Sequence, residues 1–527
     1  MRPLPFRDAL MAMIGIALVN MLVALDQTVV STALPSIVAE LKGFEYYAWI
    51  ASIYLLASVV TVPVFGRLGD YFGRRRFVVA SVLTFTFASL LCGLAPNMPF
   101  LVFARGLQGI GGGMMVGTAF ASVPDLFPDA RSRVRWQVVI TTAYGIGTAA
   151  GPSLGGLLSE HFGWRSTFFV NLPVGLAALY FVWRYLPKFP PAHKDDVGDV
   201  RVDWRGALWI AVVLGGFQVF IENVPSHGAS PGNLLLIVAV ALGCFALLRT
   251  ERSATHPIVP LDMFRHPQLV VLFTLSVLIG FVMYSLIFFA PLLLQGGFGL
   301  SPQAAGLIAT PIAACIALGS FINTPIVVRL ARPTNMLVIG FCLLAVAATG
   351  VGLSRRDTPH GLLAMAMACA GIGIGFILNN MNVFGQEIAG RERFGITTAL
   401  LQSTRMVGGM LGTTIVGTLV NHWYARGVAG TVSSFDGTLA SHAVTRALDP
   451  RILIDPALRT DLLTDLRAMG IDGTPLVETA RQTLVSAVHA GVLLTGVGAI
   501  VAALLVRRIR QIQFPKHIDR TVVVAPE

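Results

Sequence analysis

The feature of this chain that most constrains its fold is a series of long apolar segments. Fourteen segments of about 16–26 residues recur along the 527 residues, and a helix needs about 20 mostly apolar residues to span a bilayer. Strands of a membrane barrel would instead alternate in polarity over about ten residues, whereas these segments are apolar on all sides. The sequence therefore predicts an all-α polytopic membrane protein. The predicted spans are Ala9–Leu34, Tyr47–Phe65, Phe77–Ala95, Phe100–Val123, Val138–Leu158, Thr167–Leu186, Ala207–Val224, Asn233–Leu248, Leu269–Leu294, Ala304–Val328, Asn335–Leu353, Leu362–Phe384, Thr397–Asn421 and Leu484–Val506.

The composition agrees with a lipid environment. Hydrophobic residues make up 55% of the chain and charged residues 12%, with a mean hydropathy of +0.73, whereas soluble domains carry about 25% charged residues. All 5 cysteines fall inside predicted spans, so we expect no disulfide. Basic loops that face anionic lipid headgroups explain the net charge of +11, and nothing indicates nucleic-acid binding.

The distribution of lysine and arginine predicts the orientation in the membrane. If the N-terminus is cytoplasmic, inner segments carry 26 of the 38 basic residues, outer segments carry 10, and the other two lie within spans. Basic residues concentrate on the cytoplasmic side of membrane proteins. We therefore predict that both termini are cytoplasmic and that the protein lies in the cytoplasmic (inner) membrane.

A constant spacing between similar stretches indicates an internal repeat. Prolines and glycines of the second, fourth and fifth spans recur in the tenth, twelfth and thirteenth spans. This correspondence leaves six spans in each half, so the seventh and eighth spans are predicted to be an insertion between two six-helix bundles. The matched positions are Pro63 with Pro325, Gly109 with Gly371 and Gly113 with Gly375, all at 262 residues, and Gly151 with Gly412 at 261 residues.

The repeat predicts four parts of the chain. Within the second bundle, the polar segment 423–482 is predicted to lie outside the membrane. It should contain a short amphipathic helix over Leu458–Met469, capped by Asp455. The four parts are a six-helix bundle at 1–186, a linker with two inserted spans at 187–250, a second bundle at 251–506 and a cytoplasmic tail at 507–527.

Two charged residues lie at similar depth inside the spans. Asp26 is eight residues, roughly 12 Å, before the outer end of the first span, and Arg105 is six residues, roughly 9 Å, inside the outer end of the fourth. The two side chains could therefore form an ion pair. One interpretation is a structural salt bridge between two helices. The interpretation that we favour is proton coupling, in which Asp26 exchanges protons and Arg105 controls its proton affinity.

Further polar residues are candidates for the wall of a cavity between the bundles. Arg405 lies eight residues into the thirteenth span, where contact with a cavity and hydrogen bonding to neighbouring carbonyls are equally acceptable roles. Glu222 is another candidate, although its position near the end of the seventh span favours an interfacial role. Asn379, Asn380 and Gln402 could line the cavity or form hydrogen bonds between helices.

Two glycine-containing motifs belong to the first half. Segment 66–76 reads G-R-L-G-D-Y-F-G-R-R-R, in which glycines permit a tight turn and arginines hold the loop in the cytoplasm. The fifth span contains glycines and a proline that let helices approach closely or permit a bend, and packing and gating stay open as its role. The motif residues are Gly66, Asp70, Gly73, Arg74 and Arg75 in the loop, and Gly147, Gly151, Pro152, Gly155 and Gly156 in the fifth span.

These motifs resemble signatures of the major facilitator superfamily, and more narrowly of its fourteen-helix drug:proton antiporter group. Some inner-membrane pumps of tripartite multidrug systems belong to that group. Segment 66–76 resembles the superfamily's basic loop, and Leu25–Pro35 resembles the group's first-helix motif. Arg105–Gly109 is similar to the fourth-helix motif, whose arginine is implicated in proton coupling, and Gly147–Gly156 is similar to the fifth-helix motif of antiporters. The second-half copy of the loop is degraded to Arg329–Arg332, without an acid, so gating charge is expected mostly in the first half.

The resemblance implies two bundles that rock around a central cavity and exchange protons for lipophilic or amphipathic drugs. We expect no cofactor, because a proton gradient would supply the energy and the sequence contains no nucleotide-binding motif. In a cell with two membranes, segment 423–482 could contact a periplasmic adaptor protein and, through it, an outer-membrane channel.

Three alternatives stay open from the sequence. The nearest is an exporter of the same fold with narrow specificity, for a siderophore, a fatty acid or an antibiotic. An uptake symporter is disfavoured by the fifth-helix motif. An intramembrane enzyme or sensor is disfavoured because the ten histidines are scattered and no catalytic constellation lies at one depth.

Overall fold

The computed structural model describes most of the chain and is almost entirely helical. Two short strands, β1 (Arg2–Pro3) and β2 (Val524–Ala525), pair antiparallel and bring the two ends of the chain together. Some helical residues, Pro152 and Glu222 among them, have side chains outside the described part. The residues that are not described are 1, 4, 42–46, 128, 189–202, 228–229, 255–256, 434–449, 454–455, 470, 510–523 and 526–527.

Every predicted span corresponds to a helix, and the sixth is divided in two. Within the described residues, ten spans are long and apolar enough to cross a membrane, and α8 carries a shorter apolar stretch at Trp204–Phe220. The other three, on α4, α5 and α14, are richer in glycine and hydroxyl side chains but are helical over their whole predicted length. The long helices are α1 (Phe6–Leu41), α2 (Tyr47–Phe72), α3 (Arg74–Gly93), α4 (Met98–Leu126), α5 (Ala130–Phe162), α6 (Ser166–Phe169) with α7 (Asn171–Tyr185), α8 (Trp204–His227), α9 (Pro231–Ser253), α10 (Pro267–Leu292), α11 (Pro302–Val327), α12 (Asn335–Gly352), α13 (His360–Ala389), α14 (Phe394–Ser433) and α17 (Thr474–Val506). Short helical turns are η2 (Leu261–Arg265), η3 (Leu293–Gly297), η4 (Arg391–Arg393) and η5 (Pro450–Leu453).

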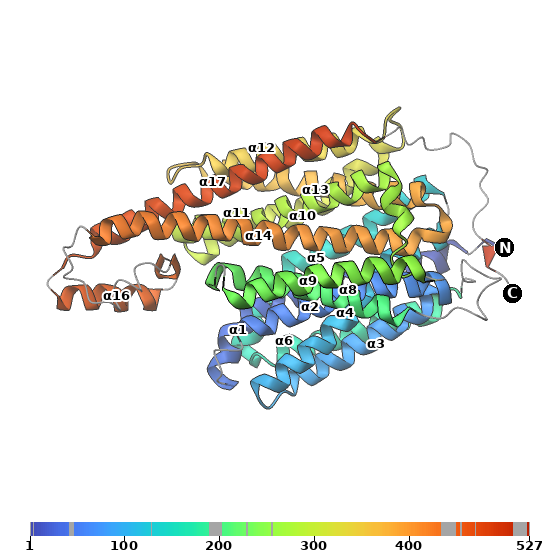
Figure 1. Ribbon diagram of the computed structural model, residues 1–527, viewed down its shortest axis with the longest axis horizontal. Coiled ribbons are helices and arrows are strands. Elements are labelled where there is room, and N and C mark those ends of the chain that lie inside the picture. The colour runs from blue at the N-terminus through green and yellow to red at the C-terminus, as the bar shows by residue number, and fades with distance from the viewer. Residues whose placement is uncertain are drawn as a thin grey trace.

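The long helices run side by side along one axis (Figure 1). We call the end of the bundle that carries both chain termini the terminal end, and the opposite end the distal end. The first half, α1–α7, packs against the second half, α10–α14 with α17, through α2 with α14 and α5 with α11. The predicted arrangement of two six-helix bundles with two inserted helices is thus confirmed. The predicted boundaries at residues 186, 250 and 506 stay predictions.

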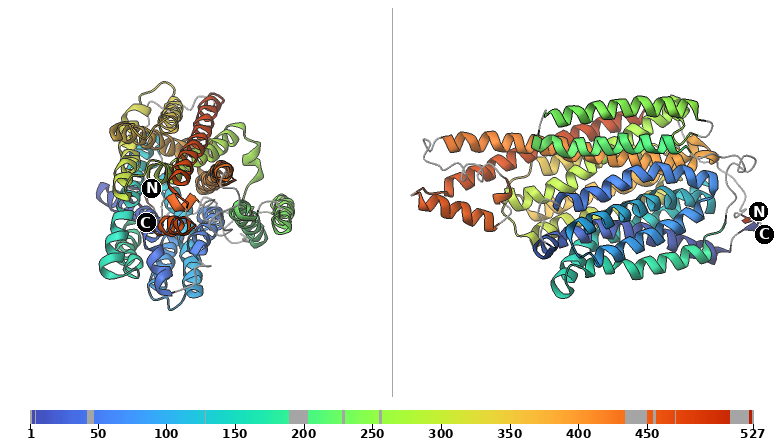
Figure 2. Two further views of the ribbon diagram at one scale, coloured as in Figure 1. Left: turned by 90° about the vertical axis from the view of Figure 1, so that its left-hand side faces the viewer. Right: turned by 60° about the horizontal axis from the view of Figure 1, so that its bottom comes forward.

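The inserted helices α8 and α9 form a hairpin at the edge of the bundle (Figure 2). Helix α8 packs against α2 and α14, whereas only 11% of the apolar stretch of α9 is buried. Leucine side chains of α9, such as Leu234 and Leu235, are exposed. Such an apolar surface suits lipid, so α9 faces the membrane and α8 holds the hairpin on the protein.

The internal repeat reappears as equivalent glycine contacts in two helix pairs. A Cβ added to Gly113 of α4 would lie 2.5 Å from the carbonyl oxygen of Ser58 on α2. A Cβ added to Gly375 of α13 would lie 2.8 Å from the backbone nitrogen of Ser320 on α11. Both pairs of residues are 262 positions apart. Glycine occurs at these positions because the two backbones leave no room for a side chain.

Helices α14 and α17 project beyond the bundle at the distal end, where α16 (Pro456–Ala468) also lies (Figure 1). Both helices are longer than predicted, because α14 ends at Ser433 and α17 begins at Thr474. The predicted short amphipathic helix is confirmed by α16, in which Leu462 and Leu466, one turn apart, are buried. Its predicted cap, Asp455, lies outside the described residues.

Candidate functional site

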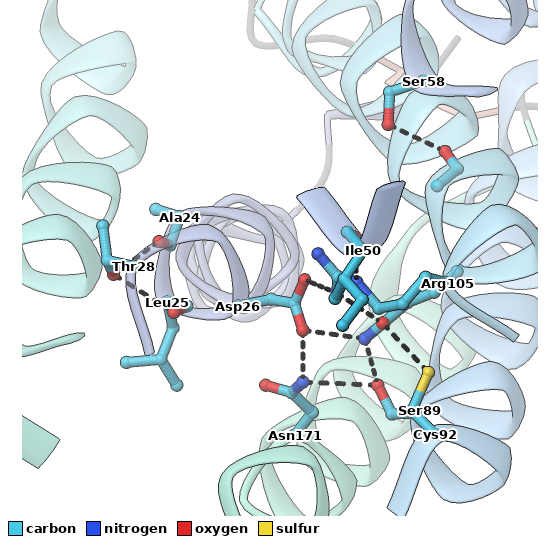
Figure 3. Close-up of polar contacts among 12 residues, drawn as sticks. Ala24, Leu25, Asp26, Thr28, Ile50, Ser58, Ser89, Cys92, Arg105 and Asn171 are labelled. Carbon is cyan, nitrogen blue, oxygen red and sulfur yellow. Dashed lines mark hydrogen bonds and ion pairs between the residues drawn. The ribbon is translucent and has the colours of Figure 1, made fainter. Parts of the chain in front are cut away.

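Asp26 and Arg105 contact each other inside the first half (Figure 3). Arg105 Nη1 on α4 donates a hydrogen bond of 2.7 Å to Asp26 Oδ2 on α1, and the exposed fractions of the two side chains are 3% and 0%. The ion pair predicted from helical depth is therefore present. Whether it exchanges protons stays a prediction.

Three further polar side chains complete the hydrogen bonds of this pair. Gln108 Nε2 and Asn171 Nδ2 donate to Asp26 Oδ1 at 2.8 and 2.9 Å. Gln108 Oε1 also accepts from Arg105 at 2.7 Å, and its amide nitrogen donates to the hydroxyl of Ser89 at 2.6 Å. The role of Gln108 could have been predicted, because residues three apart share one helix face. Ser89 and Asn171 come from α3 and α7, and no spacing in the sequence connects them to Asp26.

Arg105 is also held by groups that do not depend on the charge of Asp26. Its Nε donates to the backbone carbonyl of Ile50 on α2 at 3.2 Å. Its guanidinium carbon lies 4.5 Å from the ring centroid of Tyr54 and 5.9 Å from that of Phe168. Aromatic faces attract cations, so Arg105 keeps favourable contacts when Asp26 gains a proton.

Asp70 of segment 66–76 forms hydrogen bonds across the boundary between the halves. Asp70 Oδ1 accepts from the backbone N–H of Gly395 at 3.0 Å, and Oδ2 accepts from that of Ile396 at 2.9 Å. One turn earlier on α2, Gly66 lies against α14 as well, since an added Cβ would be 3.2 Å from the carbonyl oxygen of Gly395. The first N–H groups of a helix lack partners within the helix and carry partial positive charge. A carboxylate therefore stabilises the start of α14 and joins α2 to it.

The other motif residues brace the loop within the first half. Gly73 has a φ of 86°, in the left-handed region, and lets the chain turn from α2 into α3. Arg74 Nη2 donates to Asp70 Oδ1 at 2.6 Å, and its Nη1 donates to Asp125 on α4. Arg75 donates to a backbone carbonyl of α7. Arg74 thus connects the packing of the first half to the side chain that contacts the second.

The second half also supplies an acid at the terminal end. Arg133 on α5 forms an ion pair with Glu387 on α13 and donates to Gln386 Oε1 at 3.2 Å. Glu387 lies 262 residues after Asp125, so it is the repeat equivalent of the acid that Arg74 contacts. The constant offset was the signal that could have identified it.

Gly147 and Gly151 place α5 directly against α1. A Cβ added to Gly147 would lie 2.8 Å from a backbone carbonyl oxygen of α1, and one added to Gly151 would overlap the hydroxyl of Thr28. By contrast, nothing lies within 4 Å of a Cβ added to Gly156, so this glycine is not required by a close approach of helices. The other two motif residues are Gly155, which is buried, and Pro152, whose side chain lies outside the described part.

Two neighbouring asparagines of α13 have different surroundings. Asn380 exchanges hydrogen bonds of 2.7 and 3.2 Å with Asn323 of α11, so it connects two helices of the second half. Asn379 accepts from the hydroxyl of Thr141 on α5 at 2.5 Å, so it lies at the boundary between the halves. Its amide nitrogen has no partner in the described part of the chain.

Other buried polar groups near this boundary also lack partners among the described residues. They include both amide atoms of Gln137 on α5, both amide atoms of Gln402 on α14, and Nε of Arg405. Arg405 interacts electrostatically with Tyr144 of α5, so it faces the first half. Buried polar groups are usually hydrogen-bonded, and a bound molecule or water could satisfy these. Gln137 was not predicted, although a glutamine inside an apolar span is a recognisable signal. The side chain of Glu222 lies outside the described part.

Comparison with known proteins identifies the family. The family described as Major Facilitator Superfamily matches residues 16–413. The chain is similar to the multidrug transporter protein MdtP of Bacillus subtilis (strain 168), with 30% identity over 92% of this chain and 91% of that protein. It is similar to the tetracenomycin C resistance and export protein of Streptomyces glaucescens, with 32% identity over 77% of this chain and 75% of that protein. The chain is also similar to the solved structure of the human organic anion transporter MFSD10, with a TM-score of 0.60. The match covers 94% of this chain and 100% of that chain, and at 14% identity it shows the fold alone. This membrane-embedded chain belongs to the major facilitator superfamily of transporters.

Proposed function

We propose that this protein is a proton-coupled antiporter that exports lipophilic or amphipathic drugs across the cytoplasmic membrane by alternating access. The observation that carries the proposal is the buried contact between Asp26 and Arg105. Ionisable groups inside a membrane protein are costly and usually mark an ion or substrate pathway. A multidrug transporter and an antibiotic resistance and export protein among the relatives support drug export.

In the proposed cycle, a proton from the outer side neutralises Asp26 as drug leaves, and release of that proton inside resets the carrier. Protonation turns one acceptor oxygen into a donor. Either the hydrogen bond that Arg105 donates to Oδ2 or the bonds that Gln108 and Asn171 donate to Oδ1 must therefore rearrange. The packing of α1 against α4 and α7 changes as a result. Because α1 also contacts α5 at Gly147, the change can reach the boundary between the halves. A proton can shift this equilibrium only as far as it binds the two conformations with different affinity.

Contacts at the terminal end support a conformation that is closed there. Asp70 joins α2 to α14, and Arg133 joins α5 to α13. If the termini are cytoplasmic, as the basic residues predict, a substrate would reach the cavity from outside in this conformation. The same contacts would break when the cavity opens to the cytoplasm.

Polar groups that lack hydrogen-bond partners among the described residues support a substrate site at the boundary between the halves. Gln137, Gln402 and Arg405 offer hydrogen-bond donors and acceptors among apolar helices. A substrate with an apolar body and a few polar groups would satisfy them. A narrow-specificity exporter is the second candidate, because one relative carries the name of a single antibiotic, tetracenomycin C.

The distal projection of α14, α16 and α17 supports a further partner (Figure 1). In a cell with two membranes, we propose that this projection contacts a periplasmic adaptor and thereby an outer-membrane channel. Co-purification with and without residues 450–469 would test this contact.

The test of the function is transport by purified protein in proteoliposomes under an imposed pH gradient. We expect the wild type to move ethidium against the flow of protons, and Asp26→Asn to bind ethidium but lose gradient-driven transport. The control, Asp262→Asn, removes an acid whose side chain is 54% exposed and should transport like the wild type. Full gradient-driven transport by Asp26→Asn would contradict proton coupling through this residue. Wild-type protein that moves one antibiotic but no other drug would favour the second candidate.

A further inference from the structure

Two carboxylates meet at the terminal end of the inserted hairpin, outside the site described above. Asp203 caps α8, because its Oδ1 accepts from the backbone N–H of Gly206 at 2.8 Å. Glu251, in the last turn of α9, is 4% exposed, and its Oε2 accepts from the backbone N–H of Val259 at 3.1 Å. Each carboxylate therefore uses one oxygen to hold the backbone.

The remaining oxygen of each carboxylate points into the same small space. A Cβ added to Gly206 would lie 2.6 Å from Asp203 Oδ2 and 2.8 Å from Glu251 Oε1. Neither of these two oxygens has a hydrogen-bond partner within the described residues. Two carboxylates that share one site cannot both stay ionised without strong repulsion, and a proton held between them removes it. The described residues contain no group of three or more side chains that could hold a metal ion, which favours a proton as the ligand.

One cation and one phenol face the pair from α2. Arg67 and Tyr71 both interact electrostatically with Glu251. Two nitrogens of the Arg67 guanidinium are engaged elsewhere, since Nη2 donates to the hydroxyl of Tyr71 at 2.6 Å and Nε donates to the carbonyl of Pro257 at 3.2 Å. Its Nη1 has no hydrogen-bond partner among the described residues. Arg67 therefore weakens the repulsion between the two carboxylates without forming an ion pair with either of them.

The other charged groups near the pair point away from it. Asp70, next along α2, accepts hydrogen bonds from Arg74 and from the start of α14. The charged side chains at the adjoining ends of α8, α9 and η2 are exposed to solvent, namely Arg205, Arg249, Arg252, Asp262 and Arg265. The charge of the pair thus depends mainly on its own proton.

We propose that Asp203 and Glu251 share one proton and form a second proton-binding site, which holds the start of α8 against the end of α9 when occupied and lets them separate when empty. The bound proton forms an O–H···O hydrogen bond between the two carboxyl groups, and on release it passes to water at the terminal end. Rising pH on that side leaves two negative charges in the same space, and these separate the start of α8 from the end of α9. Arg67 interacts electrostatically with Glu251 and belongs to segment 66–76, so the charge of the pair also acts on the loop that contains Asp70. The inference goes beyond the proposed function, because the site contains neither Asp26 nor Arg105 and its test requires no transport.

The first test is infrared difference spectroscopy of the purified full chain during a pH titration. We expect a protonated-carboxyl band in the wild type that disappears as pH rises. At the low pH where the wild type shows this band, it should be lost in Glu251→Gln and in Asp203→Asn alike, because either change removes one of the two groups that share the proton. Asp262→Asn should keep the band. A band that survives in both variants would overturn the proposal. A band lost in Glu251→Gln but kept in Asp203→Asn would show that Glu251 is protonated alone, which overturns the shared proton.

The second test measures the separation of the start of α8 from the end of α9 by hydrogen exchange. Wild type and Glu251→Gln are compared at the same pH, so the chemical exchange rate is the same for both proteins. At high pH the first turn of α8 should exchange faster in the wild type than in Glu251→Gln, where one charge is absent. At low pH the two proteins should exchange equally. Equal exchange at every pH would overturn the proposal that the proton holds the ends of α8 and α9 together.

Discussion

The carboxylate of Asp70 accepts the backbone N–H of Gly395, 325 residues further along the chain, at 3.0 Å. This hydrogen bond crosses from the first half to the second and ends on the first turn of α14. Because Arg74 donates to the same oxygen at 2.6 Å, the contact between the halves depends on a charge that is balanced within the first half. This contact between the halves at the terminal end is therefore sensitive to a single side chain.

Replacing Asp70 by Asn should weaken the contact between α2 and the start of α14. Asparagine keeps an acceptor but loses the negative charge that the helix start and Arg74 stabilise, which is worth about 0.3–2 kcal/mol at a helix terminus. We expect faster hydrogen exchange in the first turn of α14, measured by mass spectrometry on the purified protein. Asp357→Asn, in which an exposed acid between α12 and α13 is replaced, is the control, and exchange in the first turn of α14 should not change in that variant. Unaltered exchange in Asp70→Asn would show that the contact does not hold the two halves together.

Replacing Arg105 by Gln should destabilise the protein. The change leaves the carboxylate of Asp26 buried without its ionic partner, and breaking a buried pair costs about 3–5 kcal/mol. The double variant Asp26→Asn with Arg105→Gln should recover part of the lost thermal stability in detergent, because no charge is left unpaired. Arg165→Gln, in an ion pair with Glu40 whose side chains are 37% and 54% exposed, should change stability little. If the double variant were no more stable than Arg105→Gln alone, the explanation by unpaired charge would fail.

Alanine at Gly151 should reduce transport, whereas alanine at Gly156 should not. The added Cβ at Gly151 overlaps the hydroxyl of Thr28, but nothing lies within 4 Å of one at Gly156. Overpacking of this kind typically costs about 1–3 kcal/mol and would push α5 away from α1. Combining Gly151→Ala with Thr28→Gly removes both the hydroxyl and the Cβ of residue 28, which would lie 2.6 Å from the added Cβ. This double variant should restore part of the activity, measured as ethidium efflux from cells with equal expression. Equal loss at both glycines would mean that the close approach of the helices is not the cause.

The ion pair of Glu40 should make a small, pH-dependent contribution to stability. Hydrogen bonds from Arg165, and then from Trp164, hold the pKa of Glu40 below its ordinary value. A carboxyl group with a lower pKa in the folded state stabilises that state above its unfolded pKa, and this contribution is lost as pH falls through its folded pKa. Glu40→Gln should therefore melt slightly below the wild type at neutral pH and together with it in acid, below about pH 4. High salt should shrink the difference, because the pair is exposed. A difference that persists in acid would point to packing instead of charge.

Much of the architecture follows from the sequence alone. Apolar runs of bilayer length become helices because buried backbone groups in lipid must be paired within the helix, and the 262-residue offset identifies the equivalent helices in the two halves. The Asp26–Arg105 contact could also be predicted, because the rise per residue determines the depth of each side chain. The same 262-residue offset could have predicted Glu387 as the equivalent of Asp125. The degraded second copy of the loop instead led to the expectation of little gating charge in the second half.

The partners of each buried group were decided only by the tertiary structure. The spans are apolar on all sides, so their sequences do not specify how far each helix is rotated about its axis. That rotation places Asn171 beside Asp26 and directs Asn380 into the second half but Asn379 toward α5. The meeting of Asp203 with Glu251 likewise depends on how α8 packs against α9. The sequence alone determined which segments lie in the membrane and how deep each charge lies, because hydrophobicity and helical rise are local properties. Which charges meet depends on side-chain packing between helices, which is not local.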